Sequence, residues 1–296
     1  MKTINIVSIY TLLLCLSFDL LAHIQDKTVP PPPVGNFSMP SVTQISPLIS
    51  FGQLLISKNT LFPQLSGSYT QSNHGYTNTI APNVIYGILD NLSITFFAPF
   101  TTKSRSFSST SSGIDDLSLQ LEYGYFSKAT LKSSLQATIV GAVYFPTGSS
   151  SKNPPTGTGS FSYLLGTTLA YLSSNWYAFL SPGAFLTMSH HGTKFGNSFL
   201  YEWGFARCLN FLSSKKCISN LMIEFDGTYS RKNKIDGITN PNSGGNTLLI
   251  TPSINLSFKR ALLQLGTSFP AIQNLNGHQN KPSYAIAYNL GISFPF

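Results

Sequence analysis

The sequence predicts an all-β fold, a transmembrane antiparallel β-barrel of about 12 strands, and three observations lead to this prediction. First, the 296-residue chain is 42% hydrophobic and only 9% charged, whereas an ordinary soluble domain carries about one quarter charged residues. Second, apolar and polar residues alternate with period two along most of the chain, which is typical of strands. Third, short and long connections alternate between these segments, as they do in outer-membrane barrels.

The composition excludes several other classes of protein. With 22 Phe and 14 Tyr, the chain is too apolar to be intrinsically disordered. A helical membrane protein needs runs of about 18 or more apolar residues, and polar residues interrupt every such run after the N-terminus. The net charge is +8, but the basic residues are scattered, so we expect attraction to an anionic membrane surface and no nucleic-acid partner.

The N-terminal part of the chain differs from the rest. Residues 1–22 have the pattern of a signal peptide, with a basic residue, a largely apolar stretch and then the small residue Ala22 before the cleavage site. Residues 23–63 form a Pro-rich N-terminal extension, in which TVPPPPVG at residues 28–35 favours a polyproline-type spacer. We expect this extension to be periplasmic or plug-like, and the barrel to occupy residues 64–296.

Alternation with period two is clearest at the C-terminus. Large apolar residues occupy every second position from Tyr284 to Phe296, and small or polar residues lie between them. A soluble β-sandwich would carry charges on its outward faces, whereas the polar faces here are mostly Ser, Thr, Asn, Gln and Gly, which suits a lumen. Segments near the ten-residue length of a membrane-spanning strand are expected at residues 64–73, 78–88, 91–101, 114–127, 130–145, 158–173, 176–188, 197–209, 217–230, 246–258, 261–270 and 283–296.

The connections between these segments set the expected orientation. Outer-membrane barrels place short turns in the periplasm and longer loops outside. We therefore expect the outer membrane of a Gram-negative bacterium as the location, with both termini periplasmic. Phe294 and Phe296 should face lipid, and a terminal aromatic residue of this kind resembles the signal read by the barrel-assembly machinery, an expected partner. The long connections are expected at residues 74–77, 102–113, 146–157, 189–196, 231–245 and 271–282.

Two stretches, GIDDLSLQLEYG at 113–124 and VYFPTGSSSKNPPTGTGSFSYLLGTTLAY at 143–171, resemble a known family. It is the meta-pathway phenol-degradation or transporter-like family of bacterial outer-membrane β-barrels. The residues that carry the resemblance are Gly113 and Asp116, then Pro146-Thr147-Gly148, then Gly157 and Gly159. The resemblance covers the barrel and implies an outer-membrane protein that passes small hydrophobic or aromatic compounds. It carries no binding residues over to this chain.

Charged residues on the expected lumen faces are candidates for a functional site. A turn centred near residue 213 would place Glu202 almost opposite Glu224, with Asp226 on the same strand face. Such carboxylates either hold a cation or are neutralised by a basic residue, and a lumen that conducts would then favour cations mildly. Glu122 and Lys132 lie within diagonal reach on adjacent strands, which predicts a lumen salt bridge.

Cys208 and Cys217 are the two cysteines left after the signal peptide. An oxidising compartment allows a disulfide between them. Strand alternation instead places Cys208 inward and Cys217 outward, which argues against the bridge. Both alternatives stay open at this point.

No catalytic set, metal site or cofactor site is expected. The chain contains no Gly-x-Ser-x-Gly, His-Glu-x-x-His or phosphate-loop pattern, and its histidines fall in loops without a metal-ligand spacing. We therefore expect no enzyme activity. The first hypothesis is a passive outer-membrane pore or transporter for small solutes, hydrophobic or aromatic ones included. The alternative is a non-transporting surface barrel with an adhesion or envelope-structural role.

Basic residues in the expected external loops have two alternative roles. They could contact anionic lipopolysaccharide in the surrounding outer-membrane lipid, or they could form an ordinary solvated surface. The sequence favours neither. These residues are Lys103, Arg105, Lys152, Lys194, Arg231, Lys232, Lys234 and Lys281.

Overall fold

A computed structural model describes residues 45–130, 133–173, 175–209, 217–258 and 260–295. The expected signal peptide, the first part of the N-terminal extension, Lys132 and Phe296 lie outside these ranges. Among the described residues, no helix is long and apolar enough to cross a membrane.

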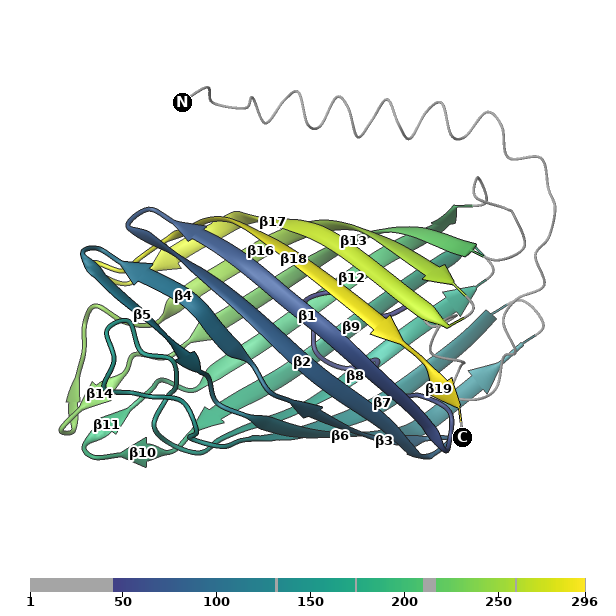
Figure 1. Cartoon of the computed structure of the whole chain (residues 1–296), viewed down its shortest axis with the longest axis horizontal. Coiled ribbons are helices and arrows are strands. Elements are labelled where there is room, and N and C mark those ends of the chain that lie inside the picture. Colours follow the sequence, from purple (N-terminus) through teal and green to yellow (C-terminus); the bar gives the residue numbers. More distant parts are fainter. Residues whose placement is uncertain (1–44, 131–132, 174, 210–216, 259, 296) are drawn as a thin grey trace, which may run out of the picture. The chain divides into compact units, whose positions relative to one another are not determined.

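Twelve antiparallel strands close into a barrel, which confirms the predicted fold class (Figure 1). The first strand pairs with both the second and the last, so the main sheet has no free edge. Three of the twelve are broken into two consecutive pieces. The strands are β1 Thr60–Ser72, β2 Gly75–Leu89, β3 Leu92–Phe97 with β4 Phe100–Ser106, β5 Ser109–Ile114 with β6 Ser118–Ala129, β7 Ser133–Tyr144, β8 Ser162–Ser173, β9 Trp176–Thr187, β12 Ser198–Leu209, β13 Cys217–Ser230, β16 Gly245–Phe258, β17 Ala261–Leu275, and β18 Pro282–Ile292 with β19 Phe294–Pro295.

The two ends of the barrel differ in their connections. We call the end where β1 begins and β18 finishes the turn end, and the opposite end the loop end. Two connections at the loop end pair with each other in a small separate sheet (Figure 1). Its strands are β10 Ser189–His190, β11 Thr193–Lys194, β14 Lys234–Ile235 and β15 Ile238–Thr239.

Several strand boundaries differ from the sequence-based expectation. β1 begins at Thr60, inside the expected N-terminal extension, because Thr60 and Leu61 already pair with β19. The expected loop 102–113 is mostly a β4–β5 hairpin, and β17 continues to Leu275 inside the expected loop 271–282. Most residues of 102–113 are Ser or Thr, and the added end of β17, residues 271–275, contains Gln273 and Asn274 beside three apolar residues. Polar residues of these types occur both in strands and in loops, so they mark no boundary in the sequence.

The alternation of the strands separates an apolar outer face from a polar inner face. On β6, Leu121 and Tyr123 are exposed on the outer face, while Gln120 and Glu122 are buried on the inner face. The buried polar residues are dominated by Ser, Thr, Asn and Gln. Phe294 is exposed, as expected for a lipid-facing side chain.

Cys208 and Cys217 are free thiols in the structure, so the disulfide allowed by the compartment is not formed. In the β12–β13 register Cys208 lies opposite Asn220, three residues along β13 from Cys217. Three residues of strand span about 10 Å, which exceeds the roughly 7 Å limit between the Cα atoms of a bridged pair.

We therefore expect protein purified without a reductant to react with a maleimide at both Cys208 and Cys217 after unfolding. The measurement is the mass of the labelled chain. A mass lacking two hydrogen atoms, with no label attached, would contradict this prediction.

Candidate functional site

The segment that precedes β1 lies inside the barrel and forms the centre of the candidate site. We call residues 45–57 the plug (Figure 1). Its backbone N–H groups donate hydrogen bonds to side chains on β3, β6, β12 and β13, and Gln264 on β17 donates one to the Ser46 carbonyl at 2.9 Å. Because these strands surround the lumen, the plug crosses it from one wall to the other.

Glu224 on β13 binds the first part of the plug. Its carboxylate accepts hydrogen bonds from the backbone N–H groups of Leu48 at 2.8 Å, Ile49 at 3.1 Å and Ser50 at 3.2 Å. The Ser50 hydroxyl oxygen lies 3.3 Å from the same carboxylate. Consecutive N–H groups that converge on one point form an anion-binding concavity, and here the anion is a side chain of the barrel wall.

Asp226 and Glu202 bind Ser50 and Phe51 of the plug. The Ser50 hydroxyl donates to Asp226 at 2.6 Å, and the Phe51 N–H donates to Glu202 at 2.9 Å. In the β12–β13 register Glu202 lies directly opposite Asp226 and diagonal to Glu224, which it was expected to lie almost opposite. The pairing is therefore shifted by two residues from the expected one, and a shift of two keeps all three carboxylates facing inward.

Glu122 on β6 holds the plug from a different part of the wall. It accepts hydrogen bonds from the N–H groups of Gln53 at 2.9 Å and Leu54 at 2.8 Å, and from the Thr138 hydroxyl at 2.8 Å.

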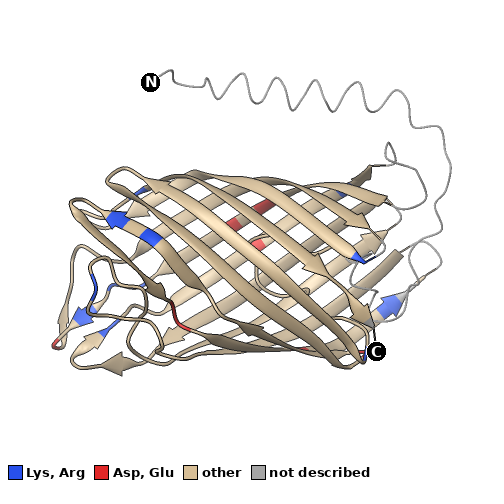
Figure 2. Cartoon of the chain, viewed as in Figure 1, with Lys and Arg blue, Asp and Glu red and all other residues tan. Residues whose placement is uncertain are grey.

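Because Lys132 lies outside the described residues, its salt bridge with Glu122 stays a prediction. The four inward carboxylates are buried, and among the described residues their hydrogen-bond donors are uncharged N–H and hydroxyl groups. Their cation preference likewise stays a prediction. Figure 2 shows acidic residues at mid-height in the barrel.

Glycine residues make room for the plug. The Phe51 ring packs against Gly166 on β8 and Gly183 on β9, where a Cβ atom would come within 2.5 and 2.8 Å of the ring. Gly52 has a φ of 85°, and a Cβ there would approach the Thr168 hydroxyl to 2.5 Å. Gly52 therefore has a backbone conformation and a close contact that only glycine accommodates without strain.

Apolar clusters fasten both ends of the plug. Ile45 packs into one cluster near the turn end of β9, β12 and β13, and Ile56 packs into a second near β2 and β17. These contacts hold the ends by burial, while the carboxylates hold the middle by hydrogen bonds. The two clusters consist of Ile45, Ala170, Tyr177, Phe179, Ala206 and Met222, and of Ile56, Phe62, Ile85 and Leu262.

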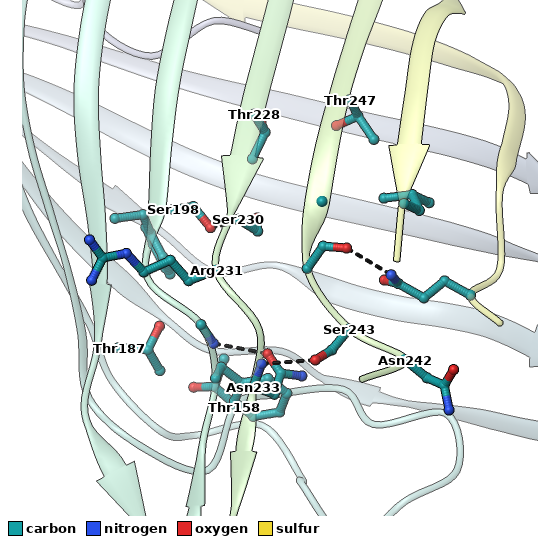
Figure 3. Close-up of a pocket in the computed structure, with 17 residues that line it drawn as sticks. Thr158, Thr187, Ser198, Thr228, Ser230, Arg231, Asn233, Asn242, Ser243 and Thr247 are labelled. Atoms are coloured by element: carbon teal, nitrogen blue, oxygen red, sulfur yellow. Dashed lines mark hydrogen bonds between the residues drawn. The ribbon is translucent and has the colours of Figure 1, made fainter. Parts of the chain in front are cut away.

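A chamber of about 390 Å³ lies in the lumen on the loop side of these carboxylates (Figure 3). Thr228, which follows Asp226 by two positions on β13, is one of its lining residues. The described lining combines hydroxyl and amide groups with the apolar side chains of Phe185, Phe195 and Leu275, and with Arg231; none of these lining residues is acidic. The chamber can therefore offer hydrogen bonds and an apolar surface to the same small molecule.

The wall on the turn side of the plug carries polar atoms that lack partners. Asn220 and Asn255 lie opposite each other on β13 and β16, are 2% and 1% exposed, and have side-chain atoms with no hydrogen bond. The hydroxyls of Tyr177, Ser253 and Ser257 are also unpaired. Buried polar groups in native proteins are almost always satisfied by protein or water, so this part of the wall is suited to contact water or a polar solute.

Several of the residues that carry the family resemblance belong to a hydrogen-bonded network at the loop end. Asp116 accepts hydrogen bonds from the Gly148 N–H at 3.0 Å and from the N–H and hydroxyl of Thr158, both at 2.8 Å. A Cβ atom at Gly157 would collide with the Asp116 carboxylate. Asp116 thus ties down the long β7–β8 connection, which explains the spacing of these residues without any contact to a solute.

The fold and the occupied lumen define a β-barrel of the outer-membrane type. The chain is similar to the crystal structure of the COG4313 outer membrane channel from Pseudomonas putida F1, with a TM-score of 0.68, 15% identity, and coverage of 84% of this chain and 100% of that chain. It also matches the NanC porin, with a TM-score of 0.48, 9% identity, and coverage of 79% and 100%. No protein-family model and no curated protein sequence matches the chain. The resemblance to the meta-pathway family therefore stays a prediction.

Proposed function

We propose that this protein is a passive pore of the outer membrane for small solutes, with the loop end facing outward and both termini in the periplasm. The outward apolar residues supply the lipid-facing wall, and the barrel has the architecture of the COG4313 outer membrane channel. The observation that carries the proposal is the lumen: mostly polar residues line a partly open chamber of about 390 Å³. Non-covalent contacts alone hold the described plug across the passage.

The chamber favours a small aromatic solute that also carries hydroxyl groups. Phe185 and Phe195 can contact a ring, while the hydroxyls and amides around them can bond to polar substituents. The resemblance to the meta-pathway family implies compounds of the same class. The volume suits a molecule of one or two rings, since about 300–1,000 Å³ is the usual range of small-molecule sites.

One observation favours the alternative, a barrel with a purely structural role in the envelope. The plug binds four inward carboxylates and packs into two apolar clusters, and all of these contacts stabilise a closed lumen. The two functions differ in whether the intact protein passes any solute.

Solute flux into liposomes that contain the full-length barrel tests the proposal. We expect phenyl glucoside to enter faster than cyclohexyl glucoside, a solute of nearly the same size and polarity without an aromatic ring. Liposomes without protein supply the background rate. Equal rates for the two solutes would contradict the aromatic preference, and background rates for both would contradict the pore.

A further inference from the structure

Two rows of outward side chains cross the wall near the loop end of β18, β1, β2 and β4. The strand registers align Tyr284, Gln71, Tyr76 and Arg105 in one row, and Ile286, Tyr69, Asn78 and Lys103 in the next. Residues of the opposite parity on β2, such as Asn83 and Ile85, are buried inside the barrel. Both rows therefore face away from the lumen and do not line the proposed passage for solutes.

The tyrosines of these rows form an aromatic cluster beside a basic side chain. The Tyr69 ring lies 6.0 Å from Tyr76 and 6.2 Å from Tyr284, centroid to centroid. The Lys103 ammonium lies 6.0 Å from the Tyr76 ring centroid. Tyrosines gather at the level of lipid headgroups in membrane proteins, so the cluster marks the boundary between lipid and water at the loop end.

A surface cavity of about 360 Å³ opens at the same place. Its described lining includes Tyr76, Arg105, His74 and Phe107, and contains no acidic residue. The His74 ring stacks on Phe107 at 4.6 Å, and the Arg105 Nε donates to the Phe107 carbonyl at 3.1 Å. This single bond orients the guanidinium and leaves its other N–H groups available to a ligand.

The wall below the rows is apolar, and the connection above them adds a further cation. Toward the turn end, the same strands expose Leu65, Phe100 and Leu290. At the loop end, the Asn73 N–H donates a hydrogen bond to the Lys281 carbonyl at 3.0 Å, and the Lys281 N–H donates one to the Asn73 side-chain oxygen at 2.9 Å. Figure 2 shows basic residues on β4 near this end. The surface thus offers positive charge, then aromatic rings, then an apolar wall.

We propose that this surface binds a phosphorylated glycolipid of the outer leaflet, of the lipid A type. Arg105 and Lys103 would contact a phosphate, since guanidinium and ammonium groups bind it by charge-assisted hydrogen bonds. The tyrosines would contact the sugar, and the acyl chains would lie along the apolar wall. This site rests on the outward orientation of the loop end and is independent of conduction through the lumen.

Native mass spectrometry of the full-length barrel in detergent tests the site with diphosphoryl lipid A, dephosphorylated lipid A and phosphatidylglycerol. We expect K103Q/R105Q to bind diphosphoryl lipid A on the order of tenfold more weakly than the unmodified protein, because each basic residue at a membrane surface contributes measurably to the binding of anionic lipid. The matched control is K232Q/K234Q, which removes the same charge from exposed loop-end positions. K103R/R105K keeps the charge and should retain most of the binding.

Three results would overturn the proposal. The first is an equal loss of affinity in K103Q/R105Q and K232Q/K234Q, which would indicate a general charge effect. The second is equal binding of the dephosphorylated lipid by the unmodified protein. The third is equal binding of phosphatidylglycerol, which would assign the surface to ordinary anionic phospholipid. Heat-modifiable mobility on a gel shows that each variant is a folded barrel.

Discussion

Deletion of residues 45–57 should raise the single-channel conductance of the barrel severalfold. The plug crosses the lumen and is bonded to several walls of it, so its removal leaves a water-filled passage along Ser, Thr and Asn side chains. The deletion stops before Thr60, where β1 begins, and therefore leaves every strand of the barrel in place. Recordings in planar lipid bilayers measure the effect.

The matched control for the deletion is Ile49→Ala. The Ile49 side chain is 39% exposed and the residue contacts the barrel through its backbone N–H, so truncation should leave the conductance near that of the unmodified protein. If the deletion and Ile49→Ala conduct equally, residues 45–57 do not limit the passage.

Replacement of Glu224 by Ala should release the plug without removing it. The change eliminates the acceptor of three backbone hydrogen bonds and leaves those N–H groups without their partner. A buried donor left unpaired costs about 1–3 kcal/mol, and each 1.4 kcal/mol is a factor of about ten in an equilibrium constant. We therefore expect the open probability in bilayer recordings to rise by at least about tenfold, with open events of the conductance seen after the deletion.

Two further variants separate loss of the plug contact from general damage to the wall. Gln120→Ala removes another buried polar side chain of β6, one whose amide nitrogen has no hydrogen bond in the structure, and should leave the open probability unchanged. Glu224→Gln keeps an acceptor oxygen and should give an intermediate value. If Glu224→Ala and Gln120→Ala give the same open probability, the Glu224 carboxylate does not keep the plug in its blocking position.

The strands and their faces could be predicted because the information is local. In a strand, successive side chains point to opposite faces, so alternation shows which residues face lipid and which face the lumen. Glu122, Glu202, Glu224 and Asp226 are inward, as their positions in the sequence predicted. The pairing of strands depends less on local sequence. The connection between β12 and β13 has no tight-turn pattern in its sequence, so their register could not be predicted from it. In the structure Glu202 lies opposite Asp226.

The sequence by itself determined the barrel, the polar lumen and the inward carboxylates, since each follows from composition and from a period of two. Only the tertiary structure decided what those carboxylates bind. The donors on Leu48 and Ile49 are 176 and 175 residues away from Glu224 along the chain, and they are backbone N–H groups, which every residue other than proline possesses. No residue type therefore marks the plug in the sequence, and the extension could only be expected to be periplasmic or plug-like. The closed barrel brings this segment and the carboxylates together, because buried charge needs donors and the plug supplies them.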